Sequence, residues 1–532
     1  MSDPRTHEGM AFDPTAEPGA GPAAAFDVPL SEIIDWRRHI HKNPELSFQE
    51  YGTADFIEGL LEEWGIETGR LTPTSVVGTI TGTAGDPATG RTIGYRADID
   101  ALPIKEETGL HFASQNSGVM HACGHDVHTA MLLGTARILQ DMRDRLHGRV
   151  KLMFQHAEEM LPGGARELVA HGAADDLDEV YAFHVAPHPI GHVGICRGRV
   201  STMSGIVSIS IRGRGGHSSN PQLSVDPVLV ASEVTVMLNT IVSRNLDPKH
   251  MNIVNVGSLH GGEAGNVIPD EAWLEVSIRS VDEGDWASIC GRIESLVNGI
   301  CHAHGATAGF EWQTPYPMVV NADLASDRAW HAATRAIGPA RVFDADPWAP
   351  SDDFSYFSRE VPGCYMFLGG GGPENGMPYF LHNSRYDVAE RAMGAGVKVE
   401  VQIALDALAP GLPGPPKRPQ NTGAMPAAGS IPPRPASPGL GVPESKAGQR
   451  RDRREFHEAS DYTDAERARV VEAAGDAGTF DGTPGGHGDH SGHGGHPGHP
   501  GHGGHPGHGG HRPHLSNDAV GQAWEASVDG KE

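Results

Sequence analysis

The sequence predicts an α/β protein that contains an inserted second domain and ends in a long disordered tail. Strand-like and helix-like segments alternate over residues 29–199, which is typical of a sheet covered by helices. Over residues 200–318 the order changes to β-α-β-β-α-β, the split βαβ unit. Residues 319–410 return to the first pattern, and residues 411–532 shift to a linker-like composition rich in Pro, Gly, Ala and Ser.

The α/β domain is predicted from periodicity and from its turn residues. Its expected elements are helices at 30–41, 53–64 and 126–141 and strands at 76–81, 92–96, 150–154 and 365–368. Ser31 and Asp126 are the expected caps of the first and third helices. The run 150–154 is continuously apolar, as expected of a strand buried on both faces of a parallel sheet. Functional residues are therefore expected at the carboxyl ends of the strands.

The inserted domain is predicted from a second set of alternating segments. Its expected elements are strands at 206–211, 251–259, 271–279 and 308–313 and helices at 225–242 and 286–302. Residues 1–28 are rich in Pro, Gly, Ala and acids and are expected to be disordered, like the tail.

The composition excludes several classes of function. A net charge of -27 argues against a partner that is a nucleic acid or an anionic membrane surface. The N-terminus has no apolar run typical of a signal sequence, and no segment is apolar enough to cross a bilayer. We therefore expect a soluble cytoplasmic protein with reduced cysteines.

Residues 120–128, Met-His-Ala-Cys-Gly-His-Asp-Val-His, offer one thiol and three imidazoles. These groups suit a transition metal such as zinc, whereas magnesium and calcium prefer oxygen ligands. The cysteines of the chain are scattered, which argues against a closed structural zinc site and favours an open catalytic one. The alternative for Cys123 alone is a small buried hydrophobe. Glu158 and Glu159, which follow the strand at 150–154, add a ligand beside a base, so a metal-dependent hydrolase is the leading interpretation.

These residues resemble the hippurate hydrolase and indole-acetyl-amino-acid hydrolase group of amidohydrolases. That group belongs to the dinuclear metallopeptidase superfamily, which includes aminoacylases and carboxypeptidases. The resemblance covers residues 30–409 and is collinear through seven landmarks: His39–Leu46, Tyr95–Pro103, Met120–His128, Glu158–Glu159, Phe183–Val185, Gly215–Ser218 and Leu381–Asn383. It implies a zinc-peptidase-like catalytic domain with a mixed central sheet, and a ferredoxin-like inserted domain that serves as lid and dimerisation domain.

The resemblance also implies a role for individual residues. It gives the metal ligands as Cys123, His125, Glu159, His184 and His382, and it leaves His121 and His128 as bystanders. Glu158 would be the general base, facing away from Glu159, and Asp100 would orient a ligand imidazole. Asp98 and Asp100 have the alternative of a solvated turn. His217 would reach the active site of a second subunit as an oxyanion donor, which implies a homodimer, and Asn266 and Arg279 would bind a substrate carboxylate.

The implied activity is hydrolysis of N-acyl-amino acids by a metal-bound hydroxide, with two divalent ions chosen from manganese, zinc, nickel and cobalt. The run from Asp352 to Ser355 carries Asp where the family usually has Glu, and this and other departures leave the acyl group open. A carboxypeptidase acting on short peptides shares the mechanism and is the nearest alternative.

The tail adds a second candidate function. From His487 to His514 a histidine recurs every three residues among Gly and Pro. Dense flexible imidazole predicts affinity for additional metal ions, and a metal-binding or storage protein is therefore the alternative from another class. A low-complexity linker that happens to be rich in histidine is the simpler interpretation of the same repeat.

Overall fold

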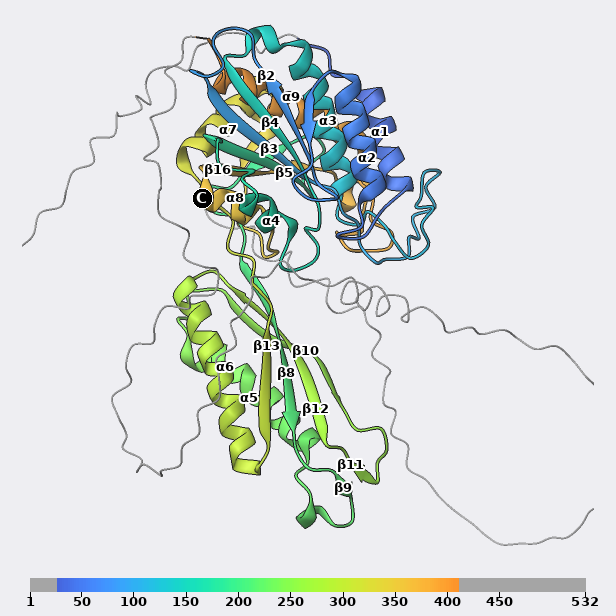
Figure 1. Ribbon diagram of the computed structural model, residues 1–532, viewed down its shortest axis with the longest axis vertical. Coiled ribbons are helices and arrows are strands. Elements are labelled where there is room, and N and C mark those ends of the chain that lie inside the picture. Colours follow the sequence, from blue (N-terminus) through green and yellow to red (C-terminus); the bar gives the residue numbers. More distant parts are fainter. Residues whose placement is uncertain (1–25, 411–532) are drawn as a thin grey trace, which may run out of the picture. The chain divides into compact units, whose positions relative to one another are not determined.

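The computed structural model in Figure 1 describes residues 26–410. The predictions for residues 1–25, for the tail 411–532 and for its His-rich repeat lie outside the described residues. Within the described range, every helix is too short or too polar to traverse a lipid bilayer.

An eight-stranded mixed sheet forms the centre of the larger domain, in the order β1-β2-β4-β3-β5-β16-β6-β15 (Figure 1). The strands are β1 (Glu67–Gly69), β2 (Val76–Thr81), β3 (Arg91–Asp98), β4 (Gly148–Gln155), β5 (Glu179–Ala186), β6 (Val193–Ile195), β15 (Val342–Asp344) and β16 (Gly363–Gly369). The central neighbours β4, β3, β5 and β16 are parallel, so their carboxyl ends meet at one edge of the sheet. The predicted mixed α/β class is confirmed.

Helices cover both faces of this sheet. The helices on one face are α1 (Leu30–Lys42), α2 (Tyr51–Glu63), α3 (His125–Asp141), α7 (Asp323–Ile337) and α9 (Met393–Ala407), and those on the other are α4 (Gly164–Ala170) and α8 (Phe354–Glu360). Strand β5 shows the division, because Tyr181 and Phe183 belong to the first core whereas Val180 and Ala182 belong to the second. The central strands are hydrophobic throughout because both faces are buried.

The two predicted helix caps are wrong. Pro29 precedes α1, and Ser31 lies inside that helix. Gly124 precedes α3 with a φ of 87°, where a side chain would be strained and its Cβ would lie 2.4 Å from Val185 Cγ2. Asp126 is instead buried in an ion pair, with its Oδ2 2.7 Å from Arg37 Nε and 2.8 Å from His41 Nδ1. Its carboxylate is therefore occupied by charges from α1 and does not cap α3.

The segment between β7 (Gly198–Arg199) and β14 (Val320–Asn321) forms a second sheet with its own core. Its elements are β8 (Met203–Arg212), β9 (Gly216–His217), α5 (Pro227–Asn245), β10 (Asn252–Gly261), β11 (Val267–Ile268), β12 (Glu271–Ser280), α6 (Glu283–His304) and β13 (Thr307–Trp312). The antiparallel order β10-β12-β8-β13 is that of the split βαβ unit. The two connections are neighbours, since β7 and β14 pair with each other.

Glu400 on α9 is a carboxyl buried in the core beside α3, where it accepts a hydrogen bond from Thr135 Oγ1 at 2.5 Å. Burial raises its pKa from an ordinary 4.5 to about 8 despite that hydrogen bond. The folded protein therefore keeps the Glu400 proton at pH values where the unfolded chain has already released it. The contribution of Glu400 to the free energy of unfolding is full below about pH 4.5 and is lost as the pH rises to about 8.

Glu400→Gln, which keeps the acceptor and removes the ionisation, is expected to raise the free energy of unfolding by roughly 3 kcal/mol at pH 8 and by much less at pH 5. Denaturant unfolding at the two pH values measures this difference, and Glu63→Gln on the exposed side of α2 is the control. An equal effect of Glu400→Gln at both pH values would contradict the prediction.

Candidate metal centre

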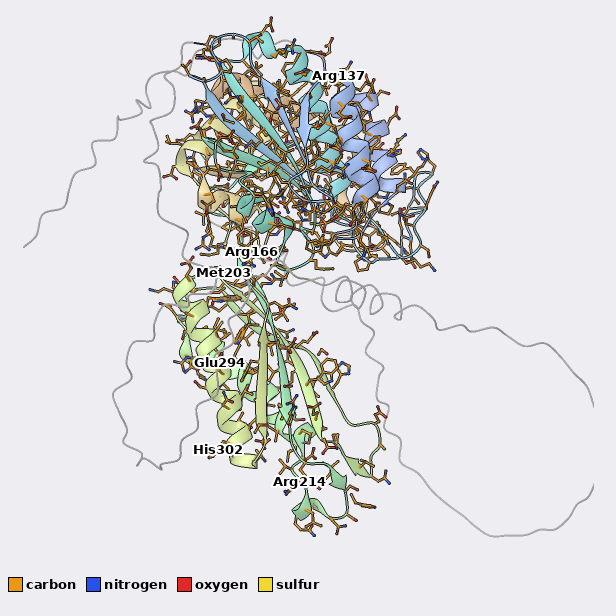
Figure 2. The ribbon with its side chains drawn as sticks, viewed as in Figure 1. Arg137, Arg166, Met203, Arg214, Glu294 and His302 are labelled. Atoms are coloured by element: carbon orange, nitrogen blue, oxygen red, sulfur yellow. The ribbon has the colours of Figure 1, made fainter. Side chains whose placement is uncertain are left out.

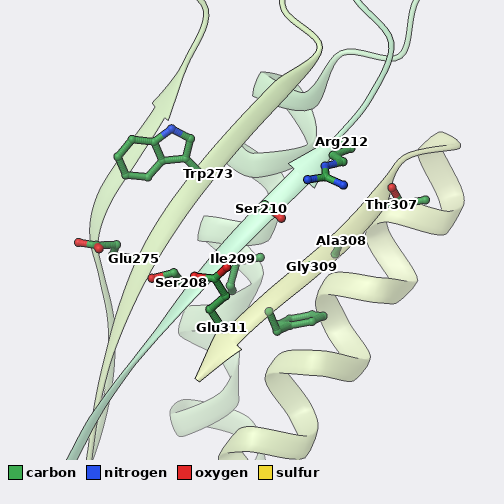
Figure 3. A pocket seen from close by; sticks show the side chains of 11 residues that line it. Ser208, Ile209, Ser210, Arg212, Trp273, Glu275, Thr307, Ala308, Gly309 and Glu311 are labelled. Atoms are coloured by element: carbon green, nitrogen blue, oxygen red, sulfur yellow. The ribbon is translucent and has the colours of Figure 1, made fainter. Parts of the chain in front are cut away.

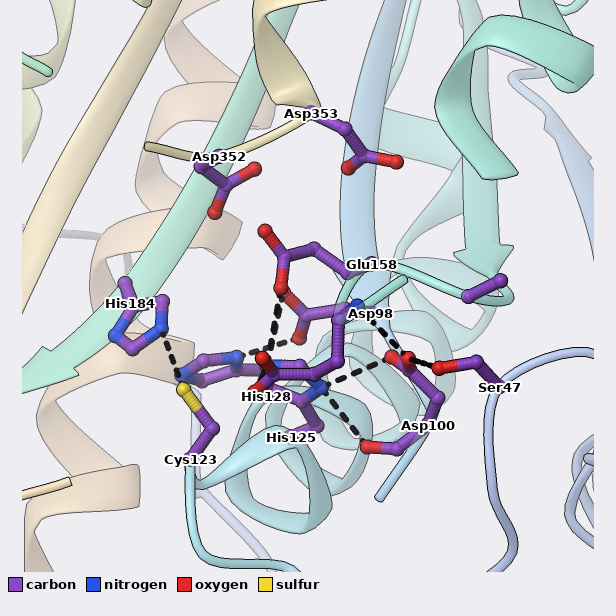
Figure 4. Close-up of polar contacts among 12 residues, drawn as sticks. Ser47, Asp98, Asp100, Cys123, His125, His128, Glu158, His184, Asp352 and Asp353 are labelled. Carbon is purple, nitrogen blue, oxygen red and sulfur yellow. Dashed lines mark hydrogen bonds and ion pairs between the residues drawn. The ribbon is translucent and has the colours of Figure 1, made fainter. Parts of the chain in front are cut away.

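Acidic, imidazole and thiol side chains converge at the carboxyl edge of the parallel strands (Figure 4). Asp98 ends β3, Glu158 and Glu159 follow β4, and His184 lies in β5. Cys123 and His125 flank Gly124 at the start of α3. Glu159 and His382 also face each other at this edge. The sheet thus brings together the five predicted ligands and the predicted base, which come from separate segments of the chain.

His125 is hydrogen-bonded to Asp100, the residue that the resemblance assigns to orient a ligand imidazole. Its Nδ1 lies 2.9 Å from the Asp100 carbonyl oxygen and 3.1 Å from Asp100 Oδ1. Nδ1 is therefore the donor nitrogen, and Nε2 is buried without a hydrogen-bond partner among the described residues. Burial alone would lower the pKa of His125, but the Asp98 and Asp100 carboxylates raise it to about 10. The surroundings of Nε2 thus favour positive charge.

Cys123 and His184 form the second part of the cluster. Cys123 Sγ lies 3.4 Å from His184 Nε2, and His184 Nδ1 is 2.8 Å from the carbonyl oxygen of Val185 (Figure 4). Burial, then Glu159 and Glu158, raises the pKa of the Cys123 thiol well above its ordinary value. Burial and the neighbouring His128 hold the pKa of His184 well below its ordinary value. Both side chains are therefore uncharged without a bound cation.

Glu159 and His382 form the solvent side of the cluster. Glu159 Oε1 lies 3.2 Å from His382 Nε2, yet it has no hydrogen-bond partner among the described residues. The His382 side chain is 53% exposed, whereas the Glu159 side chain is 11% exposed. Ligand atoms of Cys123, Glu159 and His382 all lie within 4.8 Å of one another, as do those of Cys123, His125 and His184. Cys123 is common to both groups, which is an arrangement suited to two neighbouring ions.

Glu158 does not face away from Glu159. Its Oε2 lies 4.0 Å from His125 Nε2, and Glu159 Oε1 lies 3.9 Å from the same nitrogen. The prediction assumed that two adjacent residues cannot easily face one ion, but β4 ends at Gln155 and Ala157 bends the chain with a φ of 52°, which brings both side chains to the same side. Burial raises the pKa of Glu158 well above its ordinary value, and Asp352 and Glu159 add to this effect.

Asp98 and Asp100 are buried, so the alternative of a solvated turn is wrong. Asp98 lies between His128 Nδ1 and the guanidinium of Arg96, at 2.6 Å from each. The second nitrogen of His128 accepts a hydrogen bond from the Val185 N–H at 2.9 Å, so neither ring nitrogen is left for a metal. His121 is buried, and burial lowers its pKa to about 3.

Sequence reasoning missed Arg96, the partner of Asp352 and Asp353. Arg96 lies 2.7 Å from Asp353 Oδ1 and 3.3 Å from Asp352 Oδ1. The Tyr365 hydroxyl donates to Asp352 Oδ2 at 2.7 Å. The pair of acids is visible in the sequence, but its partner lies more than two hundred residues earlier, so only the fold reveals the contact.

The predicted residues of the inserted domain are not brought together. Arg279 pairs in register with Ser204 at the start of β8, whereas His217 and Asn266 lie on the β9 and β11 side, beyond Arg212. Ser204 and Arg212 are about 25 Å apart along the strand, and Figure 2 marks the two ends by Met203 and Arg214. Arg279 donates from Nη1 to Ser351 Oγ at 3.0 Å, next to Asp352. Of Arg279, His217 and Asn266, only Arg279 is thus hydrogen-bonded to a residue next to the cluster.

A separate hollow lies on the open face of the inserted sheet (Figure 3). It is lined by residues of β8, β12 and β13, among them Ser210, Trp273 and Glu311. None of the candidate ligands lines it, and it is therefore not part of the metal centre.

The chain matches known proteins over most of its described length. The family model of peptidase family M20/M25/M40 matches residues 94–406. An N-acyl-L-amino acid amidohydrolase of Geobacillus stearothermophilus is 41% identical over 313 residues, which are 58% of this chain and 84% of that protein. The hippurate hydrolase of Campylobacter jejuni is 35% identical over 388 residues, 71% of this chain and 98% of that protein.

A solved structure gives the same match. The crystal structure of a dinuclear metal-binding peptidase from Bacillus subtilis superposes with a TM-score of 0.60 at 30% identity, covering 71% of this chain and 98% of that one. These matches confirm the predicted resemblance, and the ligand cluster described above lies within residues 94–406, the region that the family model matches.

Proposed function

This chain belongs to peptidase family M20/M25/M40, and from that premise we propose that it hydrolyses N-acyl-amino acids with two divalent metal ions. Family and relatives together make it a hydrolase that acts on amide bonds. The observation that carries the finer proposal is the pair of buried atoms without a hydrogen-bond partner, His125 Nε2 and Glu159 Oε1, which face each other among sulfur, nitrogen and oxygen donors. A buried polar atom without a partner is costly, and a cation would satisfy both atoms.

The donor set fits the two ions. Cys123, His125 and His184 would hold one of them, and Cys123, Glu159 and His382 would hold the other. Thiolate with imidazole and carboxylate suits manganese, zinc, nickel or cobalt. Because the pKa of Cys123 is well above its ordinary value, binding would have to release the thiol proton.

The side chains divide the chemistry among them. Bound divalent ions would supply Lewis acidity, which lowers the pKa of water and polarises a carbonyl. Glu158 would accept the proton of the attacking water at its carboxylate and return that proton to the nitrogen of the departing amine. Burial raises the pKa of Glu158, and Asp352 adds to this effect, so the carboxyl has to lose its own proton before it can act as a base; the positive charge of two bound ions would favour that loss. Asp100 holds the proton of His125 on Nδ1 and leaves Nε2 for a metal.

An aromatic surface and a guanidinium would bind the two ends of the substrate. Trp348 lies 5.3 Å from the ring of His184, is stacked on Phe367 at 5.2 Å and faces the exposed Phe380 at 6.2 Å, all between ring centroids. This apolar surface suits the neutral acyl group. Arg279 has no acidic partner among the described residues, and it would bind the carboxylate of the amino acid, as predicted for it. Asn266 is proposed to assist in a dimer.

Glu158→Gln is expected to lower turnover of N-benzoyl- and N-acetyl-amino acids by about a hundredfold or more, because the proton acceptor is lost. Its metal content should stay at the wild-type level, whereas Glu159→Gln should lose metal. Turnover and metal content are measured on protein loaded separately with manganese, zinc, nickel and cobalt.

A substrate panel that contains dipeptides as well as N-acyl-amino acids separates the amidohydrolase from the carboxypeptidase. Faster cleavage of dipeptides than of any N-acyl-amino acid would favour a carboxypeptidase. If no acyl-amino acid is cleaved with any of the four metals, the proposed function is wrong. Metal loss in Glu158→Gln with full activity in the metal-bound remainder would mean that the two glutamates have exchanged roles.

We further propose a homodimer in which His217 and Asn266 of one chain complete the site of the other. Both residues are exposed and lie at the end of the inserted sheet opposite Arg279. His217 Nδ1 already accepts from the Ser219 N–H at 3.1 Å, which leaves Nε2 to donate to an oxyanion.

Mixing His217→Ala with Glu158→Gln tests this proposal. If the sites are shared, half of the randomly formed dimers contain one intact site, and about a quarter of wild-type activity returns. If each chain uses its own His217, mixing restores nothing. Refolding the two variants together from denaturant ensures exchange, and each variant refolded alone is the control.

The His-rich segment at 487–514 is proposed to bind additional transition-metal ions. Its ten histidines at a spacing of three would supply ligands for about three ions. Support comes from the sequence alone, since this segment lies outside the described residues.

Deletion of residues 411–532 is expected to remove about three bound ions per chain and to leave turnover at saturating metal within about twofold of wild type. Elemental analysis and steady-state kinetics measure the two effects. Loss of turnover at saturating metal would contradict an accessory tail, and unchanged metal content would mean that the repeat is a linker.

A further inference from the structure

The turn that contains Glu158 and Glu159 is held by three side chains from distant parts of the chain. Glu50 Oε1 accepts from the Ala157 N–H at 2.8 Å, and Asp100 Oδ2 accepts from the Glu159 N–H at 2.9 Å. The hydroxyl of Tyr316 donates to the Glu158 carbonyl oxygen at 2.7 Å. Ala157 has a positive φ, which costs an L-residue free energy, so the turn depends on such external contacts.

Tyr316 differs from the other two because its backbone belongs to the connection that returns from the inserted domain. Its N–H donates to the Ser204 carbonyl at 2.8 Å, and its carbonyl accepts from the Ser204 N–H at 3.1 Å. Ser204 in turn pairs in register with Arg279 of β12. Arg279, Ser204 and Tyr316 are therefore consecutive neighbours across the strands, and the Tyr316 hydroxyl continues the row to Glu158.

The ring of Tyr316 is closely packed. The residue is 5% exposed, and a Cβ on Gly163 would lie 2.9 Å from Tyr316 Cε1 and 2.5 Å from Asp353 Oδ2. A side chain in such dense packing cannot shift without displacing the turn below it.

We propose that Tyr316 is a positioning residue that couples carboxylate binding at Arg279 to the placement of Glu158. This inference rests on the proposed function, since it takes Arg279 as the site of the substrate carboxylate. Binding of the carboxylate at Arg279 orders the neighbouring Ser204 and Tyr316. Through its hydroxyl, Tyr316 in turn orders the turn that contains Glu158. The substrate carboxylate then raises kcat as well as lowering KM.

Tyr356 is a matched control. Its ring lies 6.5 Å from that of Tyr316, and its hydroxyl donates to the carbonyl oxygen of Pro315 at 3.1 Å. Tyr356→Phe thus removes one hydroxyl, on α8, that donates to the same connection, without removing a hydrogen bond to Glu158.

Tyr316→Phe is expected to lower kcat for an N-acyl-amino acid by about tenfold, with KM changed by less than about twofold and metal content unchanged. Tyr356→Phe should stay close to wild type. The corresponding N-acyl amine, which lacks the carboxylate, should lose less in kcat when Tyr316 is replaced. The double variant with Arg279→Gln should lose less than the product of the two single losses.

Equal kcat values for Tyr316→Phe and Tyr356→Phe would overturn the inference, as would multiplicative losses in the double variant. A second measurement needs no variant: if the carboxylate lowers KM of the wild-type enzyme without raising kcat, the coupling does not exist. Each of these outcomes can be measured only if the wild-type enzyme hydrolyses N-acyl-amino acids. Absence of any such hydrolysis by the wild type would instead refute the proposed function.

Discussion

The buried guanidinium of Arg96 keeps a crowded group of carboxylates together at the carboxyl edge of the sheet. It lies within 3.3 Å of Asp98, Asp352 and Asp353, and its Nε donates to Gln155 Oε1 at 2.7 Å. Burial alone would lower the pKa of Arg96, but these acids, Asp352 foremost, raise it well above its ordinary value. Arginine suits this place because its planar fork can bind several carboxylates at once and stays charged.

Several parts of the site depend on this contact. Asp98 is fixed by Arg96 and in turn orients His128, whose other nitrogen accepts from the backbone of β5. Asp353 also accepts from the Ala165 N–H at the start of α4. Strands β3, β4 and β5 and the helices α4 and α8 are thus joined by one network of charged groups, and the candidate ligands lie along its border. Removing one partner from such a network leaves the others buried and uncompensated.

Much of the fold follows from local patterns in the sequence, whereas the electrostatics of the site do not. The period of apolar residues gives α1, α2 and β4 to within a few residues, because burial of one face is a local property. The likeness to known amidohydrolases supplied the candidate ligands. The local pattern does not reveal the role of Asp126, because its partner Arg37 lies 89 positions earlier in the chain. The orientation of Glu158 and the contact of Tyr316 likewise depend on where separate segments meet.

The pairing of β7 with β14 has a consequence for how the two domains are joined. Where an insertion begins and ends on two adjacent hydrogen-bonded strands, its removal leaves a gap that a short turn can close. The eight-stranded sheet contains no strand between Met203 and Trp312, so its order would be unaffected. The inserted domain is in this sense a detachable module. Exchange of that module would replace Arg279 and Tyr316, whereas every candidate metal ligand lies outside it.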